Sequence, residues 1–326
     1  MGQQSALSAL ALPEAWATST AEGVRTAVLD SGAEADHPDL LGHLLPGAAV
    51  DDPHGTGTQA AGILAAVTDN GVGIAGAAPD AEVLALDVLD DAGGLSPDTL
   101  ATGIAAATDA GAKVIAVTLG GTEANRATMA DAAVRPALEA AVDAGVVVVA
   151  ATIDGTRLYD DLAIVTVGTG EDGPIDPGVV TVPADEVLGT APLQPTTTWP
   201  EGTDGYEALD GSGPATALVA GTAALLVAEG LTPQEIADLL VGTAQNPDGD
   251  PALGAGTVDA ATAVAQAGTQ GAGGRTVAPS GDGEGGLAPA AVGAIAVGAA
   301  VLAVGTTFLI AGRRPRGGTD PNTPRG

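Results

Sequence analysis

Short apolar runs rich in β-branched side chains recur along the chain, and longer amphipathic segments separate them. A short apolar run bounded by Gly, Asp or Asn is typical of a buried strand. The runs predict five strands, over residues 24–29, 82–89, 113–119, 145–151 and 163–167. Because strands that alternate with helices form parallel sheets covered on both faces, we predict a doubly wound, mostly parallel α/β domain over residues 1–265.

Capping signals mark three of the expected helices. Ser96 followed by Pro97 predicts a helix to about residue 110, and the segment 132–144 predicts another that ends at Gly145. Further on, Thr232 and Glu235 have the spacing of a capping box and predict a third helix. In such folds, functional sites lie at the carboxyl ends of the strands, so the residues that follow each strand are the first candidates.

The C-terminal part of the chain has a different pattern. Residues 266–286 are Gly-rich without apolar periodicity and predict a flexible linker. Residues 287–312 carry no charge over 26 positions, which is enough to cross a hydrocarbon core of ~30 Å. The tail 313–326 opens with Arg313, Arg314 and Arg316, which predicts a single-pass protein of the cell membrane with a cytoplasmic tail and an extracytoplasmic main domain. The N-terminal residues lack the basic region of a signal peptide, so the export route stays open.

Composition excludes several classes of protein. Aromatic residues make up only 2% of the chain, so Ala, Val, Leu and Ile must build the core. The absence of cysteine removes disulfides, thiolate metal ligands and a cysteine nucleophile. A net charge of −31 argues against nucleic acid as a partner. We find no complete oxygen-ligand loop and predict neither a metal nor a cofactor.

The residue that closes the first predicted strand is Asp30, in AVLDSGAEADHPDL. This segment is similar to the aspartate motif of the subtilisin-like serine proteases. Further similar segments follow in order, and with the first they span about residues 10–265: GIAGAAPDAEVLALDVLDDAG, VTLGG, AGVVVVAA, VAGTAALL and GAGTVDAATAV. Together with the C-terminal span and basic tail, the chain most resembles the membrane-anchored mycosins associated with type VII secretion. The resemblance implies a serine nucleophile, a histidine base, an orienting aspartate and an asparagine that helps to hold the oxyanion.

The catalytic histidine that the resemblance implies is absent from its aligned position. The family motif GHGTxVAG aligns without a gap on residues 55–62, which places Thr56 at the histidine position. Threonine does not titrate near neutral pH and cannot act as the general base. His54 stands two residues earlier, where it is either a displaced replacement or a surface histidine.

The nucleophile and oxyanion positions also differ from the family pattern. The motif GTSxAxPxVAG aligns with residues 211–221, so Gly213 occupies the serine position. Ser212, one residue earlier, is either a displaced nucleophile or the N-cap of the following helix, turned away from the cleft. The family's Gly-Asn pair corresponds to Ile153 and Asp154, so a carboxylate stands in place of an amide donor.

Two functions follow from this pattern. The first is a membrane-anchored pseudoprotease that binds an extended peptide or a secretion-associated protein through Leu119, Gly120 and Gly121, which match the family's substrate-pairing segment. The second is an active serine endopeptidase with a rearranged site of Asp30, His54 and Ser212. A third possibility is a folded product without activity.

Overall fold

The computed structural model describes residues 4–48, 51–68, 73–90, 93–119, 122–152, 155–169, 174–182, 187–190 and 206–274. The chain divides into two units, 1–277 and 278–326. The second unit, with the predicted membrane span 287–312 and the tail 313–326, lies outside the described residues, as does the linker from residue 275 onward.

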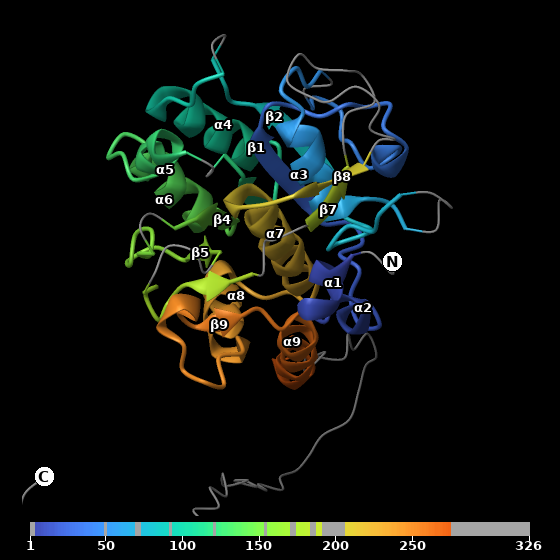
Figure 1. Ribbon diagram of the computed structural model, residues 1–326, viewed down its shortest axis with the longest axis vertical. Coiled ribbons are helices and arrows are strands. Elements are labelled where there is room, and N and C mark those ends of the chain that lie inside the picture. The colour runs from blue at the N-terminus through green and yellow to red at the C-terminus, as the bar shows by residue number, and fades with distance from the viewer. Residues whose placement is uncertain are drawn as a thin grey trace, which may run out of the picture. The chain divides into compact units, whose positions relative to one another are not determined.

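The first unit is built on a seven-stranded sheet in which every neighbouring pair of strands is parallel, in the order β2-β1-β3-β4-β5-β6-β9 (Figure 1). Its strands are β1 (Arg25–Asp30), β2 (Glu82–Asp87), β3 (Val114–Val117), β4 (Val147–Ala151), β5 (Ile164–Gly168), β6 (Val180–Thr181) and β9 (Gly256–Thr257). A separate two-stranded antiparallel sheet consists of β7 (Val187–Thr190) and β8 (Tyr206–Leu209). The five predicted strands are confirmed. The two-residue strands β6 and β9 are too short to produce a hydrophobic period and were not predicted.

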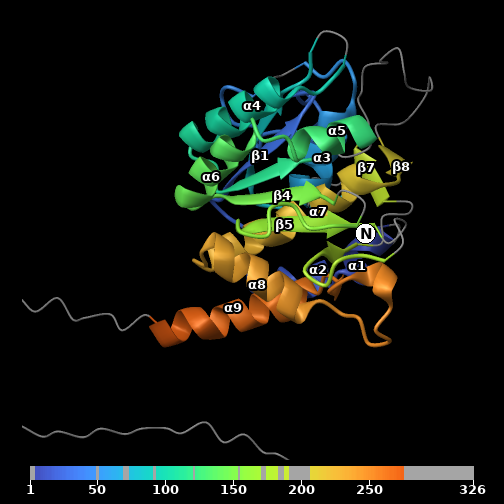
Figure 2. The ribbon, with the colours of Figure 1, turned by 90° about the vertical axis from the view of Figure 1, so that its left-hand side faces the viewer.

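Helices cover both faces of the sheet, as the alternation of elements predicted (Figure 2). One face carries α4 (Pro97–Asp109), α5 (Glu123–Met129) and α6 (Arg135–Asp143), whose apolar side chains share one core cluster. A second cluster lies on the other face, with α1 (Ser5–Ala9), α2 (Leu12–Ala15), α3 (Thr56–Ala65), α7 (Ser212–Ala228), α8 (Pro233–Thr243) and α9 (Ala260–Gly274). Two short 3-10 helices cover Pro38–Leu40 and Pro251–Leu253.

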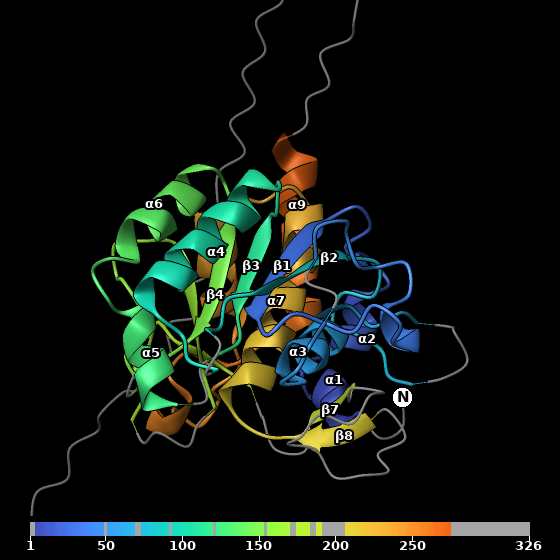
Figure 3. The same ribbon diagram turned by 90° about the horizontal axis from the view of Figure 1, so that it is seen from above.

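The central strands are buried on both faces because successive side chains point to opposite sides of the sheet. In β3, Val114 and Ala116 join the cluster around α7, whereas Ile115 and Val117 join the cluster around α4 and α6. Figure 3 shows these two helical layers on either side of the strands. This arrangement explains why the strand sequences are continuously apolar and do not alternate with polar residues.

The predicted capping boxes are present. The Ser96 side chain accepts a hydrogen bond from the backbone N–H of Thr99 at the start of α4, and Thr232 and Glu235 cap α8 reciprocally. The helix expected over 132–144 begins later, at Arg135, because the preceding residues form a turn in which Val134 N–H donates to the Asp131 carbonyl.

The linker prediction is wrong at its start. Helix α9 continues to Gly274, so residues 266–274 are helical, and Ala267 is buried in the core. Ala267 packs in the core cluster on this face of the sheet, and this tertiary contact offsets the low helix propensity of the glycines in the segment.

Among the described residues, no single helix is long and apolar enough to span a membrane. Helices α7 and α8 pass that test as a pair, by length and composition alone, with a bend of 120° between them. Both helices place buried side chains in the domain core.

Candidate functional site

A cleft of about 470 Å³ opens at the carboxyl ends of β1, β3, β4 and β5, where a parallel α/β sheet is expected to carry its site. Its volume lies within the range of small-molecule and peptide side-chain pockets. The lining comes from the strand ends, α3, α5 and the entrance to α7: Asp30, Thr56, Gln59, Ala60, Ile63, Thr118, Leu119, Asn125, Arg126, Ala151, Thr152, Val167, Thr169, Leu209, Asp210, Gly211, Ser212, Gly213 and Pro214.

Asp30 is the last residue of β1, and its side chain is buried at the floor of this cleft. The Thr56 hydroxyl donates to its Oδ1 at 2.5 Å, and the Thr118 hydroxyl donates to its Oδ2 at 2.5 Å. The backbone N–H of Ser31 also donates to Oδ1, at 2.9 Å. Burial raises the pKa of the Asp30 carboxyl above its usual value, and the hydrogen bonds from Thr118 and Thr56 act in the opposite direction.

A second buried carboxylate, Asp52, binds Ser31 and the backbone at the start of α3. Its Oδ1 accepts from the Ser31 hydroxyl at 2.7 Å and from the Gly55 N–H at 2.7 Å, and its Oδ2 accepts from the Thr58 N–H at 2.7 Å. Asp52 therefore satisfies backbone donors at the start of α3, as a capping carboxylate does. Sequence reasoning missed both Asp52 and Thr118. The position of Asp52 just before an apolar helix was an available signal, whereas nothing local marks Thr118.

Thr56, at the aligned histidine position, is the first residue of α3 and lines the cleft. Its hydroxyl binds Asp30 directly, so the aspartate has no imidazole to orient there. His54 is not among the residues that line the cleft, and its ring lies beside Gly93, where an added Cβ would be 3.0 Å from His54 Cε1. The structure therefore brings Asp30 and Thr56 together, while His54 lies beside Gly93 and is not among the residues that line the cleft.

At the aligned serine position, Gly213 lies in the first turn of α7, close to the end of β3. A Cβ added to Gly213 would be 2.9 Å from the Thr118 carbonyl oxygen, which is tighter than ordinary van der Waals contact. The helix start thus approaches the β3 backbone so closely that only glycine fits without a shift.

The N-cap of α7 is Gly211, with a φ of +97° and no side-chain cap, so of the two alternatives for Ser212 the helix-cap interpretation is wrong. The positive φ of Gly211 lets the helix begin one residue earlier, so that Ser212 occupies the first helical position. Ser212 is also among the residues that line the cleft.

Of the remaining predicted site residues, the structure describes only Leu119. Leu119 lines the cleft, and its role in binding substrate stays a prediction. Gly120, Gly121, Ile153 and Asp154 lie outside the described residues. Within the described ranges, no group of three or more His, Asp or Glu side chains could hold a metal ion.

Comparisons with known proteins agree with this architecture. The model of the subtilase family matches residues 21–185, about half of the chain, and the chain belongs to that family. Thermitase from Thermoactinomyces vulgaris is 43% identical over 120 residues, covering 35% of this chain and 43% of thermitase. The major intracellular serine protease of Bacillus subtilis is 35% identical over 122 residues, covering 33% of this chain and 38% of that protein. The matched segments thus span about two fifths of these relatives' lengths.

Solved structures extend the similarity over most of the domain. A protease from Pseudoalteromonas arctica is 30% identical with a TM-score of 0.65, covering 79% of this chain and 94% of that one. MycP1 with its N-terminal propeptide removed is 25% identical with a TM-score of 0.60, covering 79% of this chain and 96% of that one. MycP3, a protease from the type VII (ESX-3) secretion system, shares the fold at 24% identity and a TM-score of 0.60, covering 79% of this chain and 87% of that one. The Bacillus subtilis, Pseudoalteromonas arctica and MycP3 proteins are proteases, and whether this chain shares that activity depends on its own site.

Proposed function

We propose that this subtilase-fold protein is a pseudoprotease of mycosin type, which binds an extended peptide or protein segment in its cleft without hydrolysing it. The observation that carries the proposal is the bonding of Asp30. Both of its oxygens accept hydrogen bonds from threonine hydroxyls, one of them from the residue aligned with the family's histidine.

The chemistry of acyl transfer needs a base that accepts the nucleophile's proton and later returns it to the leaving group. Thr56 cannot exchange a proton in this way near neutral pH. Gly213 supplies no nucleophile, and the close Thr118 carbonyl leaves little room for one. Two of the positions needed for hydrolysis are therefore occupied by groups that cannot perform it.

Peptide binding needs no nucleophile or base, only apolar surface and hydrogen-bonding groups, and the cleft lining contains both. Side chains of Ala60, Ile63, Val167 and Leu209 give it an apolar component, and the threonines add hydrogen-bonding groups. By resemblance, the segment from Leu119 through Gly120 and Gly121 would pair with an extended chain through backbone hydrogen bonds, which require no catalytic side chain.

We further propose that residues 287–312 anchor the protein in the cell membrane by contact with lipid, with residues 1–265 outside and the tail 313–326 in the cytoplasm. An uncharged 26-residue stretch followed by arginines supports the anchor and its orientation. The similarity to MycP1 and MycP3 supports a partner among type VII secretion components.

Fluorescein-labelled casein tests binding and hydrolysis in one assay, because binding raises its anisotropy whereas cleavage releases quenched fluorescence. We expect a rise in anisotropy without release of fluorescence. Release of fluorescence would overturn the pseudoprotease assignment, and no rise in anisotropy would overturn peptide binding. A fluorophosphonate probe for activated serines should leave the protein unlabelled.

The alternative, an active endopeptidase using Asp30, His54 and Ser212, has one observation in its favour, since Ser212 does line the cleft. Its test is the pair of variants Ser212→Ala and Ser8→Ala, the second of which removes an exposed serine on α1. Fluorophosphonate labelling that disappears in Ser212→Ala and persists in Ser8→Ala would establish the alternative.

A further inference from the structure

The wall of the cleft formed by α5 has little support of its own. This helix has seven residues, of which only Met129 is buried, yet it contributes Asn125 and Arg126 to the cleft lining. A helix of this length is unstable in isolation, so contacts from elsewhere in the protein must hold it. The last carbonyl groups of a helix have no partner within the helix, and they are natural points for such contacts.

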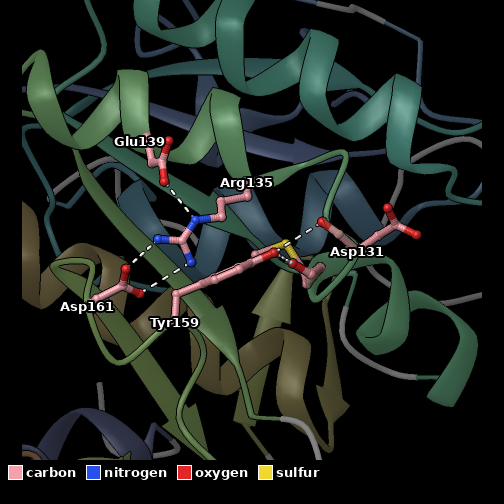
Figure 4. A network of polar contacts seen from close by, with 6 residues as sticks. Asp131, Arg135, Glu139, Tyr159 and Asp161 are labelled. Carbon is pink, nitrogen blue, oxygen red and sulfur yellow. Dashed lines mark hydrogen bonds and ion pairs between the residues drawn. The ribbon is translucent and has the colours of Figure 1, made fainter.

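Besides the packing of Met129 in the core, Tyr159 supplies such a contact from the loop between β4 and β5. Its hydroxyl lies 3.0 Å from the Met129 carbonyl oxygen and 3.1 Å from the Asp131 carbonyl oxygen, and it donates to this pair of acceptors (Figure 4). Met129 is the last residue of α5, and Asp131 belongs to the turn that follows. The phenol therefore caps the carboxyl end of α5 from a distant part of the chain.

Arg135 holds Tyr159 in this position. The guanidinium carbon lies 5.4 Å from the centre of the Tyr159 ring, and Arg135 forms ion pairs with Glu139 on its own helix and with Asp161, two residues beyond the tyrosine (Figure 4). Its hydrogen bonds to Asp161 come from two guanidinium nitrogens, a geometry that fixes direction as well as distance. The same bonds hold the pKa of Asp161 below its usual value.

The backbone at Tyr159 is strained. Its φ is +49°, a left-handed conformation that disfavours a residue with a side chain. Such strain persists only where surrounding contacts impose it, and it concentrates near functional sites. The loop that carries it connects β4 and β5, whose ends place Ala151 and Val167 in the cleft.

We propose that Tyr159, clamped by Arg135 and Asp161, is a positioning residue that fixes α5 as a wall of the cleft and so sets its affinity for an extended peptide. The part of this inference that concerns peptide affinity rests on the proposed binding function. The part that concerns α5 stands on the contacts alone and can be measured without a ligand.

The test compares Tyr159→Phe with Tyr206→Phe by hydrogen exchange and mass spectrometry. Tyr159→Phe keeps the ring under Arg135 and removes only the hydroxyl. Tyr206→Phe is the matched control, because it removes the hydroxyl of the chain's other tyrosine, which interacts with Asp39. We expect the amides of α5 to exchange roughly five- to tenfold faster in Tyr159→Phe alone, the effect of one lost hydrogen bond. Asp161→Asn, at an exposed position, should act in the same direction by a smaller factor.

Unchanged α5 exchange in Tyr159→Phe, or an equal increase in Tyr206→Phe, would overturn the positioning role. Labelled casein then provides the second measurement, with a severalfold rise in Kd expected for Tyr159→Phe. If wild type binds casein and Tyr159→Phe binds it equally well despite a loosened α5, the link to affinity is wrong. If wild type does not bind casein, the proposed function fails, and α5 exchange still decides the positioning role.

Discussion

Replacing Gly213 with serine introduces the residue that our alignment assigns to the family's nucleophile. The structure predicts that it damages the fold, and the proposed function predicts that it produces no protease. The added Cβ would lie 2.9 Å from the Thr118 carbonyl oxygen, which is backbone at the end of β3 and cannot rotate away. Overpacking of this kind costs about 1–3 kcal/mol. For a domain of this size, 1 kcal/mol corresponds to about 2–4 °C, so we expect the Tm to fall by roughly 2–12 °C.

Gly242→Ser provides the matched control, because Gly242 is also helical and an added Cβ there meets nothing within 4 Å. Its Tm should stay constant or rise slightly, since serine has a higher helix propensity than glycine. The assay is thermal unfolding followed by circular dichroism, with fluorophosphonate labelling of the same samples. An unchanged Tm in Gly213→Ser would refute the argument from close approach, and strong labelling would refute the argument that Thr56 cannot replace the histidine.

Three further predictions concern the fold that carries the site. Because burial raises the pKa of Asp30, the folded protein binds the proton more tightly than the unfolded chain, so this residue lowers the free energy of unfolding as pH rises from the ordinary aspartate pKa through the folded-state pKa. Asp30→Asn should abolish that contribution, which urea unfolding from pH 4 to pH 8 would detect. A free energy of unfolding that depends on pH as in wild type would contradict it. Thr232→Ala removes the cap of α8 and should cost about 0.5–2 kcal/mol in urea unfolding, and no cost would show that the cap is redundant. Leu225→Ala, at a fully buried position of α7, should cost about 2–5 kcal/mol in the same assay, and a loss below 1 kcal/mol would mean that the core refills the space.

The fold was predictable because its signals are local and repeated. Apolar runs indicated β1 to β5, and Ser96 and Thr232 marked the starts of α4 and α8 by capping spacing. The boundaries that failed depend on distant contacts. Helix α9 packs on the core through residues up to Ala267 and continues to Gly274, and β6 and β9 are strands only because the sheet pairs them.

The chemical identity of the site residues is likewise in the sequence. Our alignment to the family motifs predicts that Thr56, Gly213 and Asp154 stand where the family has its histidine, serine and asparagine, and a side chain's capacity to exchange protons follows from its type alone. Only the tertiary structure decided which distant residues supply the hydrogen-bond partners of the site. Thr118 reaches Asp30 across 88 residues of sequence, and Tyr159 reaches the end of α5 across 30. The physical reason is that hydrogen bonds between distant segments depend on strand register and helix docking, which the whole core sets and no local pattern encodes.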